Sequence, residues 1–78
     1  MKLVYTDHAA EKIVERGISK KRIAKAVKNP DAIRKGKFGR KIIHKDIKGK
    51  LLRIIVSKEN DTYRIITVYY TSPERYVT

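Results

Sequence analysis

The sequence of 78 residues contains no cysteine and no tryptophan, and it has only two histidines. Without cysteine the chain cannot form disulfides, thiolate metal sites or a cysteine nucleophile. With His8 and His44 as its only imidazole groups it is poorly suited to a structural metal site, and we expect no cofactor. No apolar run is long enough to span a bilayer, and the apolar start of the chain ends at Thr6. We therefore expect a cytoplasmic protein without a signal peptide.

Acidic residues are also scarce. Asp and Glu number 8 against 20 Lys and Arg, which gives a formal net charge of +12. A cationic surface of this density favours a polyanionic partner, most often nucleic acid. The alternative is a well-solvated lysine surface. A chain of this length predicts a single domain, 1–78, with a thin core.

Two segments rich in β-branched and aromatic residues give the strongest structural signal. They cover 50–57 and 62–70, and the polar segment 58–61 between them predicts an antiparallel hairpin at the centre of a sheet. Strand alternation sorts their side chains into two faces. One face carries Leu52, Ile54, Val56, Tyr63, Ile65, Thr67 and Tyr69, and the other carries Leu51, Arg53, Ile55, Arg64, Ile66, Val68 and Tyr70. We expect helices to cover the first face, and the second, which contains the arginines, to point outward.

Two helices are predicted before this hairpin. The first covers 8–16, is capped by Thr6 or Asp7, and stops at Gly17. The second begins at Ser19 and ends at 29–31. With strands at 2–5 and 40–47, the order is β-α-α-β-β-β. This order predicts an α+β fold in which two N-terminal helices pack on one face of an antiparallel sheet of three to four strands.

Two basic segments are candidate RNA contacts. Lys20, Lys21 and Arg22 crowd the first turn of the second helix, where the helix dipole disfavours cations and a phosphate would offset this. The alternative is a tolerated surface cluster. Segment 34–41 has two glycines, several cations and one ring, which suit a loop that follows a phosphate chain and stacks on a base. Equally, Phe38 would simply pack at a sheet edge.

Several motifs resemble a group of small bacterial and archaeal domains related to the RelE/ParE toxin superfamily. They are Tyr5-Thr6-Asp7-His8-Ala9-Ala10-Glu11-Lys12, Glu15-Arg16-Gly17-Ile18-Ser19, Asn29-Pro30-Asp31, Leu52-Arg53-Ile54-Ile55-Val56 and Ile65-Ile66-Thr67-Val68-Tyr69. The resemblance implies a RelE-like fold and the toxin of a type II toxin-antitoxin system. Such a toxin is a metal-independent ribonuclease that cleaves messenger RNA, often on the ribosome, and is silenced by a small acidic antitoxin.

The resemblance also implies site residues. The catalytic candidates are Arg53 on the central strand, His8 and Arg16 from the signature, Lys50, and Arg75 and Tyr76 after the last strand. Among the RNA-binding candidates, Lys48 follows from the resemblance. The others follow from charge and from their place on the predicted elements, and they are Lys12, Lys20, Lys21, Arg22, Lys37, Arg40, Arg64 and Tyr70. No metal ligand is predicted.

RNA cleavage by internal attack needs a base for the 2′-hydroxyl, an acid for the leaving 5′-oxygen and cations around the phosphorane. Arginine is always protonated, so Arg53 would stabilise charge. The base remains open between His8, His44 and a lysine whose pKa neighbouring cations depress. Tyr70 or Tyr76 would orient a phosphate, donate a proton or stack on a base.

Each of these residues also has a structural interpretation. Arg53 would pair with a carboxylate across the sheet, and His8 would hold the helix start. His44 on an outer strand is more often a surface residue, and Tyr69 and Tyr70 would pack at a strand end. Two further functions stay open: a non-catalytic RNA- or DNA-binding module, and an inactive toxin relative whose apolar outer face binds a partner or a second copy of the chain.

Overall fold

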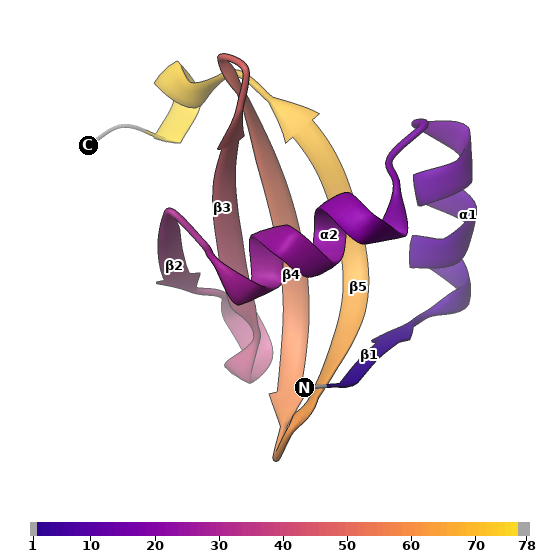
Figure 1. Cartoon of the computed structure of the whole chain (residues 1–78). Helices are drawn as coiled ribbons and strands as arrows, with labels where there is room; N and C mark the ends of the chain where they lie inside the picture. Colours follow the sequence, from indigo (N-terminus) through magenta and orange to yellow (C-terminus); the bar gives the residue numbers. More distant parts are fainter. Residues whose placement is uncertain (1, 77–78) are drawn as a thin grey trace.

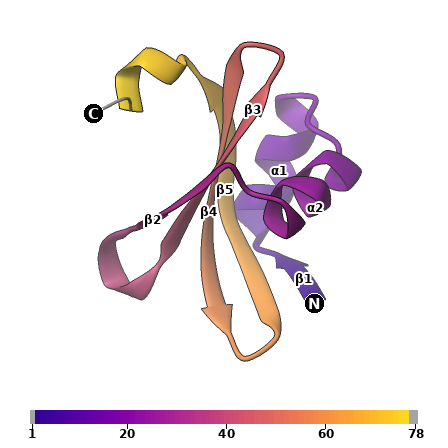
Figure 2. The same ribbon diagram turned by 60° about the vertical axis from the view of Figure 1, so that its left-hand side comes forward.

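The computed structural model describes residues 2–76, with side chains described through residue 74. In this part of the chain a five-stranded mixed sheet carries two α-helices on one face (Figures 1 and 2). The elements are β1 (Lys2–Tyr5), α1 (Asp7–Glu15), α2 (Lys20–Lys28), β2 (Ala32–Lys35), the short 3-10 helix η1 (Lys37–Gly39), β3 (Lys41–Ile47), β4 (Lys50–Glu59), β5 (Thr62–Thr71) and the 3-10 helix η2 (Pro73–Tyr76). The strand order is β1-β5-β4-β3-β2.

The two helices begin at the caps that their sequences indicate. Oγ1 of Thr6 accepts a hydrogen bond from the backbone N–H of Ala9 at 3.1 Å, so Thr6 rather than Asp7 caps α1. Oγ of Ser19 caps α2 in the same way, accepting from the N–H of Arg22 at 3.1 Å. Such caps contribute about 1 kcal/mol each. Gly17, with φ of 66°, supplies the left-handed residue after α1.

The core lies between the helices and the inner face of the sheet, that is, the face the helices cover. Leu52, Ile54, Val56 and Ile65 are fully buried there, as predicted. The helices contribute Ala9, Ile13, Ile23, Ala26 and Val27 to the same cluster. The hairpin is therefore the centre of the fold, and its turn is the two-residue segment 60–61.

The predicted antiparallel sheet of three to four strands is wrong in two respects. β1 joins the edge of the sheet in parallel with β5, with Leu3 opposite Tyr63. Residues Ala32–Lys35, of which 34 and 35 were predicted to belong to a loop, form the additional strand β2 against β3. The strand at 2–5 lies where the sequence predicts it, and only its parallel pairing was not predicted. β2 is exposed along its whole length, so its sequence carries no apolar alternation, and its main-chain pairing with β3 defines it.

A β-bulge interrupts the pairing of β4 with β5. Ile55 lies opposite Thr67, whereas the next residue, Val56, lies opposite Ile65. Ile66 is therefore an extra residue on β5. Because side chains alternate between faces, one inserted residue moves every later side chain of β5 to the other face.

The predicted faces of the hairpin are consequently wrong after the bulge. Val68 turns inward and is fully buried in the core, and Tyr70 packs against the same core. Thr67 and Tyr69 turn to the outer face, where Tyr69 lies opposite Arg53. Arg53 itself lies on the outer face, as predicted, between the inward Leu52 and Ile54.

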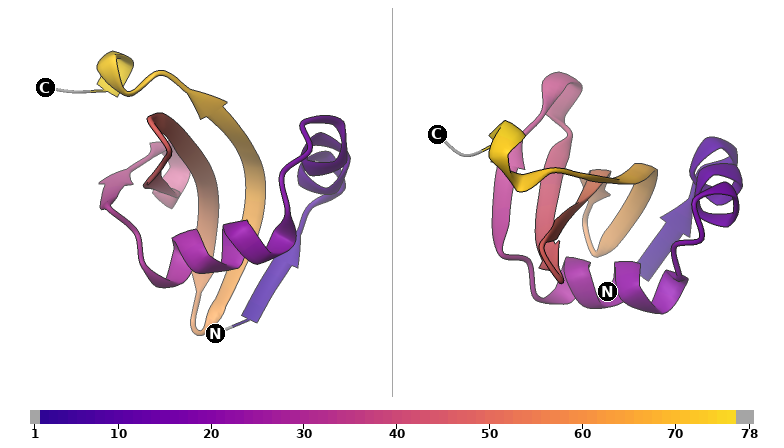
Figure 3. Two further views of the ribbon diagram at one scale, coloured as in Figure 1. Left: turned by 45° about the horizontal axis from the view of Figure 1, so that its top comes forward. Right: turned by 90° about the horizontal axis from the view of Figure 1, so that it is seen from above.

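The outer face is flanked by two projecting segments. In Figure 2, η2 and the hairpin formed by β2, η1 and β3 lie on the side of the sheet opposite the helices. Seen from above in the right panel of Figure 3, the tip of that hairpin projects away from α2. Leu51, which is 9% exposed and outside the core cluster, shows that part of the outer face is also covered.

Candidate functional site

A row of functional side chains crosses the outer face of the sheet. His44 on β3 lies opposite Arg53 on β4, and Arg53 lies opposite Tyr69 on β5. Nη1 of Arg53 donates a hydrogen bond to the hydroxyl of Tyr69, and its guanidinium carbon lies 5.8 Å from the centroid of that ring. Arg34 on β2 lies two residues after Ala32, the residue opposite His44, and therefore shares this face. We call Arg34, His44, Arg53 and Tyr69 the outer-face cluster.

His44 is the most buried polar side chain of this cluster, at 4% exposure. Burial lowers the pKa of its imidazole, and the positive charges of Arg53 and Arg34 lower it further. The neutral imidazole, in which one ring nitrogen carries no proton, is therefore the favoured form at pH 7. Nε2 of His44 and Nε of Arg53 are both buried atoms.

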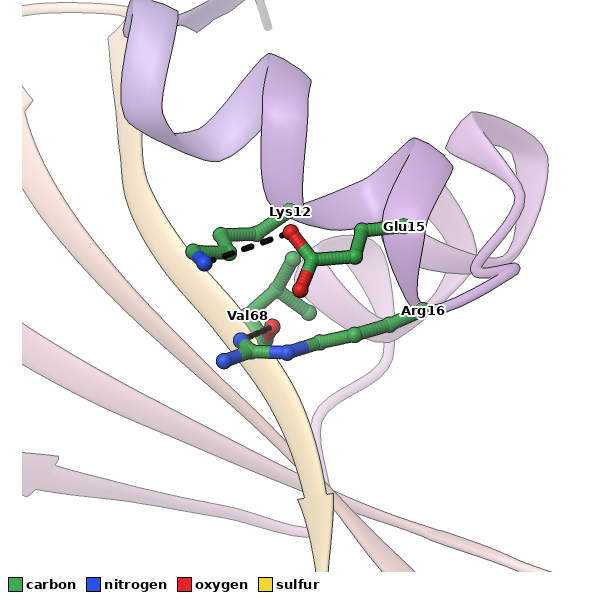
Figure 4. Close-up of polar contacts among 4 residues, drawn as sticks. All are labelled: Lys12, Glu15, Arg16 and Val68. Atoms are coloured by element: carbon green, nitrogen blue, oxygen red, sulfur yellow. Dashed lines mark hydrogen bonds and ion pairs between the residues drawn. The ribbon is translucent and has the colours of Figure 1, made fainter.

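Arg16, at the end of α1, brings another cation to Tyr69. Its Nη1 donates a hydrogen bond to the backbone carbonyl of Val68 at 2.8 Å, as Figure 4 shows. β1 pairs with β5 only as far as Ile65, so this bond satisfies a carbonyl on the edge of β5 beyond β1. The guanidinium carbon of Arg16 lies 6.0 Å from the ring centroid of Tyr69. Tyr69 is thus approached by Arg53 from the sheet and by Arg16 from α1.

A second basic region lies around α2 and the β3–β4 turn. Neighbouring hollows of about 390 and 320 Å³ open there and share Arg22 and Ile47. A third, of about 310 Å³, continues past Lys50 and Tyr70 toward η2. We call the first two together the α2 hollow; its lining is Ser19, Lys21, Arg22, Lys25, Ala26, Lys45, Ile47, Lys48, Lys50 and Tyr70. This lining has six cationic side chains and no carboxylate.

Two polar contacts shape the α2 hollow. Nη1 of Arg22 donates a hydrogen bond to the hydroxyl of Tyr70 at 3.0 Å, which is possible because the bulge turns Tyr70 toward the helices. Nζ of Lys45 forms an ion pair with Asp31 at 3.4 Å. The backbone N–H of Asp46 donates to the same carboxylate, and this bond, followed by the charge of Lys45, lowers the pKa of Asp31. Lys45 is therefore partly neutralised, whereas the other cations add charge to the hollow.

The structure brings several predicted residues together in the α2 hollow. They are the RNA-binding candidates Lys21, Arg22, Lys48 and Tyr70 and the catalytic candidate Lys50. The basic candidates therefore lie in two regions: the outer-face cluster on one face, and the α2 hollow on the inner face and at the end of the sheet. Lys25 and Lys45 were not predicted.

Other predicted residues lie elsewhere. His8 is exposed in α1, within the helix layer and away from Arg53. Lys12 forms an ion pair with Glu15 at 3.3 Å (Figure 4). Lys20 places its Nζ 5.0 Å from the ring centroid of Tyr5. Lys37 and Arg40 lie at η1, and Arg64 is exposed opposite Ser57. The side chains of Arg75 and Tyr76 lie outside the part of the chain that the structure describes.

Sequence reasoning underestimated two residues. His44 was expected at the surface, but it is buried beside Arg53. The sequence signal was strand alternation, because within 42–46 the side chain of His44 shares one face of the strand with every second residue. Tyr69 was assigned to the inner face, and only the bulge places it beside Arg53. A bulge leaves no simple mark in a run of β-branched residues.

Comparison with known proteins places the chain in a family. A family model described as a domain of unknown function (DUF4258) matches residues 5–70. The chain belongs to this family. The match includes His44, Arg53, Tyr69 and Tyr70, and it ends before η2. No curated protein and no solved structure matches this DUF4258 domain.

Two negative findings hold for residues 2–76 of the DUF4258 domain. None of the helices in that range is both long and apolar enough to cross a membrane. In the same range no group of three or more His, Cys, Asp or Glu side chains is placed to hold a metal ion.

Proposed function

We propose that this DUF4258 domain is a toxin-type endoribonuclease, as its resemblance to RelE-like proteins implies, with the outer-face cluster as its reactive centre. One observation carries the proposal: the buried imidazole of His44 lies opposite Arg53, which in turn donates a hydrogen bond to the hydroxyl of Tyr69. Base, cation and hydroxyl donor are the groups that internal cleavage of RNA requires.

The proposed reaction uses each group once. The imidazole of His44 accepts the proton of the 2′-hydroxyl as the 2′-oxygen attacks the adjacent phosphorus. Arg53, supported by Arg34, stabilises the negative charge on the phosphorane oxygens. Tyr69, which accepts a hydrogen bond from Arg53 and keeps its own proton, donates that proton to the leaving 5′-oxygen. The phosphorus–oxygen bond to that oxygen breaks, which leaves a 2′,3′-cyclic phosphate and a 5′-hydroxyl.

The α2 hollow supports the proposal as a binding region. Its cations would hold phosphates of the RNA by charge, without reading sequence. A small acidic antitoxin, which the resemblance implies, would compete for the same cations. We therefore assign RNA binding to the α2 hollow and chemistry to the outer face.

A second candidate function is a non-catalytic RNA-binding module. The observation that favours it is the burial of Nε2 of His44, because a buried nitrogen cannot reach a 2′-hydroxyl until the side chains over it move. Under this alternative the outer-face cluster stabilises the sheet, and the charge of +12 alone accounts for the binding.

An RNA cleavage assay with the purified protein separates the two functions. The wild type, with and without ribosomes, is expected to yield fragments with cyclic phosphate ends. His44→Ala is expected to lose this cleavage. The matched control is His8→Ala, which removes the other histidine from the opposite layer of the fold. Loss of cleavage in His8→Ala together with intact cleavage in His44→Ala would refute the assignment of His44 as the base. Binding that weakens steeply with salt, without any cleavage, would establish the binding module instead.

A further inference from the structure

Phe38 occupies an unfavourable position for a phenylalanine. It lies in η1 at the tip of the hairpin between β2 and β3, and it is 88% exposed. Its backbone has φ of 59° and ψ of 37°, a left-handed conformation that glycine and asparagine adopt readily and bulky residues rarely do. Neither burial nor backbone preference explains an aromatic ring here. The prediction that Phe38 packs at a sheet edge is therefore wrong for the isolated chain.

The surroundings of Phe38 are strongly cationic. Segment 34–41 contains five Lys and Arg, and the chain has no acidic residue between Asp31 and Asp46. The guanidinium carbon of Arg40 lies 5.7 Å from the ring centroid of Phe38. An exposed ring within a cluster of cations fits a ligand that carries both flat apolar faces and negative charge. A single-stranded nucleic acid has both.

We propose that Phe38 stacks on an unpaired base of single-stranded RNA while Lys37 and Arg40 contact the flanking phosphates. A base inside a duplex offers no free face to the ring, so the ligand is single-stranded or looped RNA. This inference rests on the proposed function in taking RNA as the ligand, and it adds which part of the RNA is held and by which residue.

The tip is well placed to position RNA for the outer-face cluster. β3 begins at Lys41, directly after the tip, and reaches His44 three residues later. Three residues of strand span on the order of 10 Å. A base stacked on Phe38 therefore places neighbouring nucleotides over the face that carries His44 and Arg53.

The absence of tryptophan allows a direct test. In Phe38→Trp the new indole is the chain's single tryptophan, and stacking on a base is expected to quench its fluorescence when a single-stranded RNA oligonucleotide is added at low salt. Heparin, a polyanion without bases, is expected to bind without this quenching. The matched control is Val14→Trp, which puts the indole on α1 at a position that is 81% exposed in the wild type, and which should stay unquenched.

Affinity and stability should respond in opposite ways to removal of the ring. Phe38→Gly is expected to weaken binding of the oligonucleotide on the order of tenfold. Its melting temperature should be equal to or higher than that of the wild type, because glycine adopts this φ without strain. Phe38→Tyr should retain the affinity. A ring needed only for folding would instead lower the melting temperature when it is removed.

Three results would overturn the inference. Phe38→Trp fluorescence that is unchanged at saturating RNA would exclude stacking. Equal RNA affinity and equal KM in Phe38→Gly and the wild type would also exclude stacking. This result would leave the proposed cleavage at His44 untouched if that cleavage is intact. A concentration-dependent dimer in sedimentation that Phe38→Gly dissociates would assign the ring to an interface between copies. Quenching by RNA without any cleavage would support the stacking and refute only the proposed reaction.

Discussion

His44 and Arg53 lie opposite each other on β3 and β4, so a desolvated imidazole sits beside a permanent cation on the outer face of the sheet. Directly opposed side chains on neighbouring antiparallel strands have Cβ atoms roughly 5 Å apart. At that separation the guanidinium opposes protonation of the imidazole. The pair thus places a neutral imidazole beside a permanent cation that is able to stabilise an anion.

Stability should depend on pH through His44. Its folded pKa is lowered, so below its ordinary value of 6.5 the unfolded chain binds a proton that the folded chain does not. This contribution to the free energy of unfolding is complete above pH 6.5 and is lost as the pH falls through the lowered folded pKa. Thermal melts should show a decreasing melting temperature from pH 7 to pH 5, with 1 kcal/mol corresponding to about 4–8 °C.

The variant His44→Gln should flatten this pH dependence, whereas His8→Gln, at an exposed position, serves as its control. Asp31 also has a lowered pKa, but from 3.8, so its contribution is lost only at more acidic pH. An unchanged slope between pH 7 and 5 in His44→Gln would contradict the assignment.

Arg53 should be needed for its shape as well as its charge. Arg53→Lys keeps the charge but loses the planar fork that contacts Tyr69 and, in the proposed reaction, the phosphate. We expect the cleavage rate of Arg53→Lys to be about 10²–10³-fold lower than that of the wild type at unchanged RNA affinity. The cleavage rate of Tyr69→Phe should fall by a similar factor. The measurement is single-turnover cleavage, with Lys58→Ala at the far end of β4 as the control. Near wild-type rates in Arg53→Lys would limit its role to charge.

Removal of cations from the α2 hollow should weaken binding and leave the chemical step intact. We expect Lys21→Ala combined with Lys25→Ala to raise KM and to leave kcat unchanged. The slope of log affinity against log salt should fall by about 0.7 for each phosphate of a single strand that the variant no longer neutralises. Lys28→Ala, at the end of α2 and outside the lining, is the control. Equal effects from both changes would show a diffuse charge effect instead of a binding region.

Arg16 should stabilise the fold through the edge of β5. Arg16→Ala leaves the carbonyl of Val68 without its charged donor and should lower the free energy of unfolding by about 1 kcal/mol. Lys12→Ala removes only an exposed ion pair within α1 and should cost about 0.5 kcal/mol or less. Urea denaturation measures both. A decrease in Lys12→Ala as large as that in Arg16→Ala would show that the hydrogen bond to the carbonyl contributes nothing specific.

Local features of the fold were predictable because local physics specifies them. Thr6 and Ser19 satisfy the first amides of their helices, and Gly17 adopts the left-handed conformation that ends α1. The inward set that begins with Leu52 and Ile54 follows from strand alternation alone. In these places the residue and its nearest neighbours along the chain carry the whole signal.

The candidate site was predictable only in part. Arg53 was expected on the outer face and is there. Lys21 and Arg22, expected to attract a phosphate at the start of the second helix, both line the α2 hollow. His8, predicted from the family resemblance, lies in the other layer of the fold. Side chains from distant segments meet according to strand register and packing, and resemblance to a motif does not determine either.

By itself, the sequence determined the charge of the surface, the helix caps, the central hairpin and the inward residues of β4. The tertiary structure alone decided the parallel pairing of β1, the extra strand β2 and the bulge at Ile66. The bulge reverses the faces of Tyr69 and Tyr70, so one tyrosine joins Arg53 and the other joins Arg22. The reason is physical: alternation fixes which neighbours share a face, but register depends on pairing between strands, and one inserted residue exchanges the faces of all that follow.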